Sequence, residues 1–211
     1  MKINDYDHIF WDFDGVIKDS LEIKTQAFYD LFLEFGQEIA NKVKEHHILN
    51  SGVSRYEKMP IYLKWSNQEV SSENIDLFLS SFKEKVVDKV VKSPWVPGSK
   101  DFLKDNIYNQ NFYLVTATPQ DEIQDILKKI NLSDSFVDCF GSPKKKQEAI
   151  METILKYKLV KSRCIMIGDA VADLEAAKKN NISFLLRQHE YNNHMSLDLE
   201  TNFKISDLTE L

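Results

Sequence analysis

Two aspartates at the end of an apolar run are the residues with the clearest chemical meaning in this chain. Residues 9–13 read Ile-Phe-Trp-Asp-Phe, and Asp14 and Gly15 follow directly, so Asp12 and Asp14 lie two positions apart. Carboxylates are rarely buried without a partner, and glycine lets the backbone turn tightly beside them. The pattern indicates a site that uses carboxylate chemistry, although Asp-Gly is also an ordinary turn signal.

Three further segments carry residues suited to phosphoryl transfer, which needs a nucleophile, charge neutralisation and a proton for the leaving oxygen. The Thr116 hydroxyl and the Ala117 backbone N–H end one apolar run, where a β-branched residue is also an ordinary choice. Asp169 and Asp173 follow another apolar run. Lysines occupy 144–146, a cluster that could neutralise a phosphoryl group or lie solvated at the surface.

The elements that must position these residues read as an α/β fold. Short apolar runs occur at 9–13, 112–116, 137–140, 164–167 and 183–186, with helical patterns between most of them. This alternation predicts a Rossmann-like parallel sheet covered on both faces. Ligands of such sheets bind at the carboxyl ends of the strands, where the polar residues above are expected to meet.

Residues 18–91 break the alternation, because they contain only helical patterns. One stripe begins at Leu21, and another begins at Ile75 after the possible caps Ser71 and Ser72. We therefore expect a core domain of residues 1–17 and 92–211, with a small all-helical domain of residues 18–91 inserted after the first strand. A block inserted there would lie over the site as a lid.

Two cations of this helical block are candidates for substrate binding. Lys24 lies on the apolar stripe of its helix, so it either extends to solvent at the edge of the stripe or points into the cleft. Arg55 follows a polar turn, where it could grip an anionic group with two hydrogen bonds or lie at the surface. His46 and His47 lack an obvious third ligand, and we interpret them as structural or surface residues.

Composition restricts the remaining possibilities. The net charge of −6 argues against a general nucleic-acid binder, and no apolar run approaches the ~18 residues of a membrane helix. The first residues contain no signal-peptide pattern, so a cytoplasmic location is expected, with Cys139 and Cys164 as reduced thiols. The sequence is compatible with a monomer or a dimer.

The four polar segments, in this order, resemble the haloacid dehalogenase superfamily of aspartate-nucleophile phosphohydrolases. The resemblance implies that Asp12 is the nucleophile, that Asp14 is the general acid and base, and that Thr116 binds the phosphoryl group. Gly15 and Ala117 are then assigned to substrate binding. A Gly-Ser-Pro-x-x-Lys arrangement points to Lys146 as the active-site lysine, with Lys145 as the alternative, and it implies a helical cap after the first strand.

The resemblance also implies Mg²⁺ as the cofactor. Asp12, Asp169 and the backbone carbonyl of Asp14 would supply oxygen ligands, which a hard cation prefers. Asp173 would orient the lysine or a metal-bound water instead of binding the ion. The expected activity is Mg²⁺-dependent hydrolysis of a small phosphorylated metabolite through an aspartyl-phosphate. A sugar-phosphate mutase is the alternative, and a non-catalytic binding protein on the same fold is a third possibility.

Overall fold

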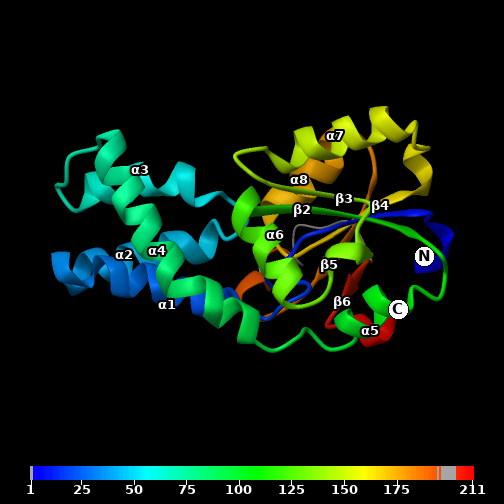
Figure 1. Cartoon of the computed structure of the whole chain (residues 1–211), viewed down its shortest axis with the longest axis horizontal. Helices are drawn as coiled ribbons and strands as arrows, with labels where there is room; N and C mark the ends of the chain where they lie inside the picture. The colour runs from blue at the N-terminus through cyan, green and yellow to red at the C-terminus, as the bar shows by residue number, and fades with distance from the viewer. Residues whose placement is uncertain (1, 194, 196–202) are drawn as a thin grey trace.

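The computed structural model describes residues 2–193, 195 and 203–211, which form a parallel sheet and a separate group of helices (Figure 1). Within these residues the sheet has six strands in the order β3-β2-β1-β4-β5-β6, and every neighbouring pair is parallel. The strands are β1 (His8–Trp11), β2 (Asn111–Pro119), β3 (Asp138–Ser142), β4 (Cys164–Gly168), β5 (Ser183–Arg187) and β6 (Lys204–Ile205). The five apolar runs identified in the sequence are the first five strands. The short β6 carries no such run and was not expected.

Strand residues alternate between two cores, as the two-residue period of a strand requires. Ile9 and Trp11 of β1 belong to one apolar cluster, and Phe10 belongs to the other. The first cluster includes residues of α5 (Ser99–Asp105) and α6 (Gln120–Lys129), and the second includes residues of α7 (Lys146–Tyr157) and α8 (Val171–Asn180). Both faces of the sheet are therefore covered, which explains why its strands are apolar throughout.

The helical block of residues 18–91 contains α1 (Leu21–Phe32), α2 (Gln37–Leu49) and α3 (Arg55–Trp65), and α4 (Ser72–Lys92) leads back to the core. Its interior is aromatic, with the rings of Phe28 and Phe82 only 4.1 Å apart between centroids. The Ser71 hydroxyl accepts a hydrogen bond from the Asn74 backbone N–H and caps α4, as the sequence predicts.

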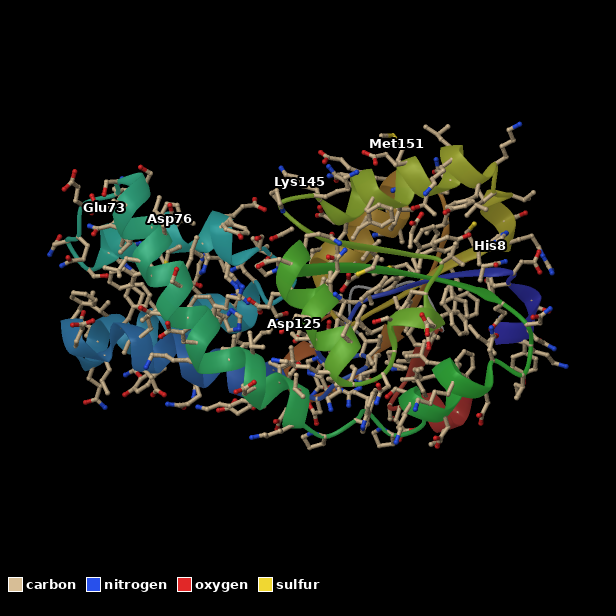
Figure 2. The ribbon with its side chains drawn as sticks, in the orientation of Figure 1. His8, Glu73, Asp76, Asp125, Lys145 and Met151 are labelled. Atoms are coloured by element: carbon tan, nitrogen blue, oxygen red, sulfur yellow. The ribbon has the colours of Figure 1, made fainter. Side chains whose placement is uncertain are left out.

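The two segments that join the helical block to the sheet lie side by side. The Asp19 N–H donates to the Pro94 carbonyl at 2.9 Å, and the Val96 N–H donates to the Ile17 carbonyl at 3.1 Å. The chain thus leaves and re-enters the sheet at one place. His8, the first residue of β1, lies at the end of the sheet away from the block (Figure 2), so β1 runs toward the block.

Candidate active site

Asp12 directly follows β1 and is held at the carboxyl end of the sheet. Its backbone N–H donates to the Ile167 carbonyl of β4 at 3.0 Å, which extends the ladder by one residue. Asp12 is 4% exposed, and its Oδ1 lies 2.9 Å from Lys146 Nζ. Lys146 also donates to Asp173 Oδ1 at 2.6 Å, so one buried lysine bridges two aspartates.

Of the two candidate lysines, the structure brings Lys146 to Asp12. Lys146 is the first residue of α7, and its side chain is buried. Lys145 is exposed on the loop before α7 (Figure 2), and the neighbouring Lys144 pairs with Glu152 at the surface. The helix directs one lysine of the cluster inward and leaves the other two outside.

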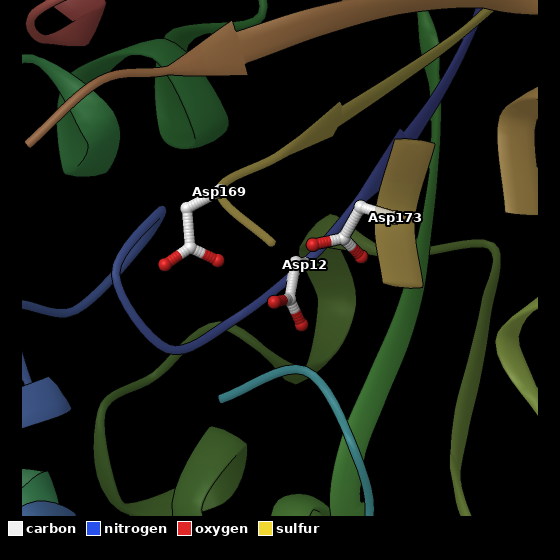
Figure 3. Close-up of side chains that lie close together, drawn as sticks. All are labelled: Asp12, Asp169 and Asp173. Atoms are coloured by element: carbon white, nitrogen blue, oxygen red, sulfur yellow. The ribbon is translucent and has the colours of Figure 1, made fainter. Parts of the chain in front are cut away.

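Three buried carboxylates meet beside this lysine. One oxygen each from Asp12, Asp169 and Asp173 lies within 4.8 Å of the others, and Figure 3 shows Asp12 between the other two. Gly15 leaves room for this arrangement, because a Cβ at its position would lie 2.5 Å from Asp169 Oδ2. Its φ of +76° is also a conformation that glycine adopts without strain.

Burial and mutual repulsion make these carboxylates hold protons more tightly than usual. Burial raises the pKa of Asp12 to about 7, Lys146 opposes this shift, and Asp173 adds to it. The pKa values of Asp169 and Asp173 are raised by burial as well. Burial alone would lower the pKa of Lys146, but Asp12 and Asp173 raise it above its ordinary value. The cluster therefore has excess negative charge that a cation could neutralise.

Asp14 lies in a different set of contacts. Ser20 Oγ donates to its Oδ1 at 2.6 Å, and Lys24 Nζ and Thr118 Oγ1 donate to its Oδ2 at 2.5 and 3.1 Å. Burial alone would raise the pKa of Asp14, but Lys24 and the two hydroxyls lower it below its usual value. Asp12 and Asp14 are thus shifted in opposite directions although they are two residues apart, which is common where two carboxyl groups have separate roles.

Lys24 therefore points into the cleft and not to solvent. It extends from α1 of the helical block to Asp14 and also donates to Thr118 Oγ1 at 2.8 Å. Ser20 and Thr118 belong to the same network but were not identified from the sequence. Thr118 lies two residues beyond Thr116, at the same end of β2, and this spacing was the one available signal.

Thr116 and Ala117 line a cleft of about 240 Å³ together with Lys146 and the turn at Val53–Ser54. The Ser54 and Ser142 hydroxyls are 2.9 Å apart across this cleft, so the turn of the helical block contacts the core. A smaller cavity of about 30 Å³ lies beside Asp14.

The small cavity is rich in cations. Its lining includes Lys24, Arg55 and Lys58. Lys58 is 2% exposed, and its Nζ lies 2.9 Å from His47 Nδ1. Burial lowers the pKa of Lys58 well below its usual value, and Lys24 and Arg55 contribute to this effect. His47 is therefore a buried partner of a lysine, and the sequence gave no sign that these two side chains would meet.

Arg55 is buried as well, but it is already paired. Its two terminal nitrogens donate to the two carboxylate oxygens of Glu122 at 3.0 and 2.7 Å. The side chains of Arg55 and Glu122 are only 6% and 1% exposed. This bidentate pair joins the first residue of α3 to the first turn of α6, and Glu122 was not identified from the sequence.

The chemistry of the acidic cluster fits a hard divalent cation. Its donors are carboxylate oxygens, which Mg²⁺ prefers, and Asp12 and Asp169 can both reach one point. Asp173 has other partners, because it accepts from Lys146 and from the Ala170 backbone N–H at 3.1 Å. Asp12 and Asp169 are thus the carboxylates suited to hold the ion, with Asp173 holding the lysine.

Comparisons with known proteins agree with this fold. The computed chain resembles a haloacid dehalogenase-like family hydrolase from Streptococcus pneumoniae (18% identity, 98% of this chain and 96% of that chain, TM-score 0.70). It also resembles CbbY from Rhodobacter sphaeroides in complex with phosphate (16%, 98% and 96%, TM-score 0.76). A third similar structure is the β-phosphoglucomutase of Clostridium difficile (20%, 98% and 93%, TM-score 0.74).

No curated protein matches the sequence. Among the described residues, no helix combines the length and apolar character needed to cross a bilayer. The model of the haloacid dehalogenase-like hydrolase family matches residues 9–186, which include all four polar segments and the helical block. The chain therefore belongs to the haloacid dehalogenase-like hydrolase family of enzymes.

Proposed function

We propose that this protein is a Mg²⁺-dependent phosphatase that hydrolyses a small phosphorylated metabolite. The observation that carries the proposal is the placement of Asp12. It is a buried carboxylate at the end of a central strand, 2.9 Å from Lys146 and within reach of Asp169. A carboxylate in this position can attack phosphorus while a cation on each side reduces the negative charge.

In the proposed reaction, an Asp12 oxygen forms a bond to phosphorus as the bond to the ester oxygen breaks. Asp14 gives a proton to the leaving oxygen, and Asp12 becomes an aspartyl-phosphate. Asp14 then takes a proton from water, and that water cleaves the acyl-phosphate. Lys24 keeps Asp14 ionised in the structure described here. The negative charge of an incoming phosphoryl group would raise the pKa of Asp14 and allow it to act first as an acid.

The other residues have supporting roles in this proposal. Lys146 neutralises Asp12 and the phosphoryl group, and the Thr116 hydroxyl and the Ala117 N–H bind phosphoryl oxygens. Asp12, Asp169 and the Asp14 backbone carbonyl hold Mg²⁺, which supplies further positive charge at the phosphoryl oxygens. Gly15 is the position that keeps space open beside Asp169.

We further propose that residues 18–91 act as a cap domain over a core of residues 1–17 and 92–211. Lys24 of the block contacts Asp14, and the Ser54 turn contacts Ser142 of the core, so the block lies against the site. Lys24 and Arg55 would bind the non-reacting part of the substrate in the small cation-lined cavity. Arg55 would then exchange its contact with Glu122 for one with the substrate or share it.

Asp12→Asn tests the proposal. The amide is nearly isosteric but is a poor nucleophile and a weaker metal ligand, so phosphate release should be abolished while circular dichroism and thermal unfolding stay near wild type. Wild-type protein quenched during turnover of a labelled phosphate ester should carry hydroxylamine-sensitive label, and the variant should carry none. Release of phosphate by Asp12→Asn near the wild-type rate, with deamidation excluded by mass spectrometry, would sink the assignment.

A sugar-phosphate mutase remains the second candidate, because one of the similar structures is a β-phosphoglucomutase. Such an enzyme would use the same nucleophile but return the phosphoryl group to the sugar. Incubation with hexose monophosphates distinguishes the two. A phosphatase releases inorganic phosphate, whereas a mutase forms an isomeric monophosphate through a bisphosphate. A non-catalytic binding protein would do neither.

A further inference from the structure

Asp169 is held at two points by one short segment that follows β5. His189 Nε2 lies 2.9 Å from Asp169 Oδ2, and the two side chains are 10% and 2% exposed. Asn192 Nδ2 donates to the Asp169 backbone carbonyl at 2.8 Å and to the Arg187 carbonyl at 2.8 Å. The segment therefore holds both the backbone and the carboxylate of this residue.

The hydrogen bonds of His189 determine which ring nitrogen carries the hydrogen. The Tyr191 backbone N–H donates to His189 Nδ1 at 3.2 Å. An N–H group needs a lone pair as its acceptor, so Nδ1 is unprotonated and the hydrogen lies on Nε2. The neutral ring then donates from Nε2 to the Asp169 carboxylate. One imidazole thus caps a turn with one nitrogen and holds an aspartate with the other.

Asp169 needs such a partner because of its surroundings. Asp12 and Asp173 place carboxylate oxygens within 4.8 Å of it, and their charge repels its own. Lys146, which offsets this charge, donates to Asp12 and Asp173 and not to Asp169. Among the residues that the structure describes, His189 is the side chain with a recorded hydrogen bond to the Asp169 carboxylate.

From this geometry, and resting on the proposed metal site, we propose that His189 is a positioning residue for cation binding. It fixes the Asp169 carboxylate next to Asp12 and leaves the other lone pairs of the carboxylate free for a divalent cation. Hydrogen-bond partners of metal ligands typically change metal affinity by about 10–100-fold when they are removed. His189 itself would not bind the ion.

Two substitutions separate this role from a purely structural one. The Gln side chain places its amide nitrogen near the position of Nε2, so His189→Gln keeps a donor for Asp169 and loses the acceptor for Tyr191. The shorter Asn places its amide oxygen near Nδ1, so His189→Asn keeps the cap and loses the donor. A positioning role predicts that the Asn variant is impaired, whereas a role in capping the turn predicts that the Gln variant is impaired.

The experiment is isothermal titration of the purified full chain with Mg²⁺. We expect His189→Asn to weaken Mg²⁺ binding by about 10–100-fold and His189→Gln to bind close to wild type. Tyr191→Phe is the matched control, because it removes the 3.1 Å contact of the Tyr191 hydroxyl with Glu22 of α1 and leaves His189 in place. Its affinity should equal that of wild type. The KM for Mg²⁺ in a phosphatase assay should rise in the same order, with kcat at saturating Mg²⁺ changing less.

The remaining outcomes overturn the proposal in different ways. Equal affinity in both His189 variants and wild type would show that the contact does not position the ligand. Weak binding by the Gln variant alone would show a capping role, and equally weak binding by both would indicate that the imidazole binds the ion directly. Absence of Mg²⁺ binding by wild type would instead reject the proposed metal site, and this role with it. Asp169→Asn, expected to lose binding, confirms that the titrated site is the one described.

Discussion

At the scale of single residues, the site separates two aspartates of one short motif by their surroundings. Asp12 is surrounded by other carboxylates, and its pKa is raised to about 7, chiefly by burial. Asp14 receives hydrogen bonds from Ser20, Lys24 and Thr118, and its pKa is lowered despite burial. The difference arises from three donors, one of which comes from the helical block.

Lys24→Met should raise the pKa of Asp14 by about 1–3 units, because burial then acts without the opposing cation. Asp14 would be followed by ¹³C NMR of its carboxyl carbon, assigned by comparison with Asp14→Asn. In wild type the lowered pKa stabilises the fold above the unfolded value of about 3.9, and this contribution is lost as the pH falls through the folded pKa. In the variant this contribution should shrink or reverse.

Lys83→Met is the control for this titration, since Lys83 pairs with Asp121 at the surface and does not contact Asp14. It should leave the Asp14 titration unchanged. An unchanged Asp14 pKa in Lys24→Met would mean that the hydroxyls alone set it.

At the scale of elements, α6 is the part of the core to which the helical block is most clearly attached. Arg55 of α3 pairs with Glu122 in the interior, while Lys83 of α4 pairs with Asp121 at the surface. These two ion pairs join the same helix to the block but differ in exposure. A buried charge that loses its partner destabilises the fold strongly, whereas an exposed pair contributes little.

Arg55→Met should therefore lower the free energy of unfolding by about 3–5 kcal/mol, because Glu122 is left buried and unpaired. Lys83→Met should lower it by about 0–1 kcal/mol, because both partners are largely solvated. Urea denaturation at equilibrium would measure both. The double variant with Arg55→Met and Glu122→Leu should recover most of the loss, since no unpaired charge remains. Equal losses in the two single variants would contradict the distinction.

At the scale of the whole molecule, the site is assembled from distant parts of the chain. Asp12 follows β1, Lys146 begins α7, and Asp169 and Asp173 follow β4. Folding brings these like charges together, so the ion-free cluster opposes the fold that creates it. A cation that binds this cluster and not the unfolded chain stabilises the whole fold by mass action.

Mg²⁺ at 100 times its dissociation constant should stabilise the protein by about 2.7 kcal/mol and raise the thermal midpoint by about 5–10 °C. Differential scanning calorimetry with and without the ion would measure the shift, and excess chelator should reverse it. Asp169→Asn should show a much smaller shift under the same conditions. A wild-type midpoint that is indifferent to Mg²⁺ would count against the metal site.

The sequence by itself determined the residues whose positions depend on local order along the chain. Five strands could be predicted because buried strands are apolar runs, and parallel strands bring their carboxyl ends to one edge of the sheet. Asp12, Thr116 and Asp169 therefore had to lie near one another, and a helix after the lysine run could turn Lys146 inward.

Only the tertiary structure decided which side chains from separate elements meet. Arg55 and Glu122 are 67 residues apart, Lys24 and Thr118 are 94 apart, and His189 and Asp169 are 20 apart. Periodicity assigns a residue to a face of its own element, but it does not specify the partner that packing brings to that face. These contacts depend on how the helical block and the segment after β5 pack against the sheet, so no local pattern could predict them.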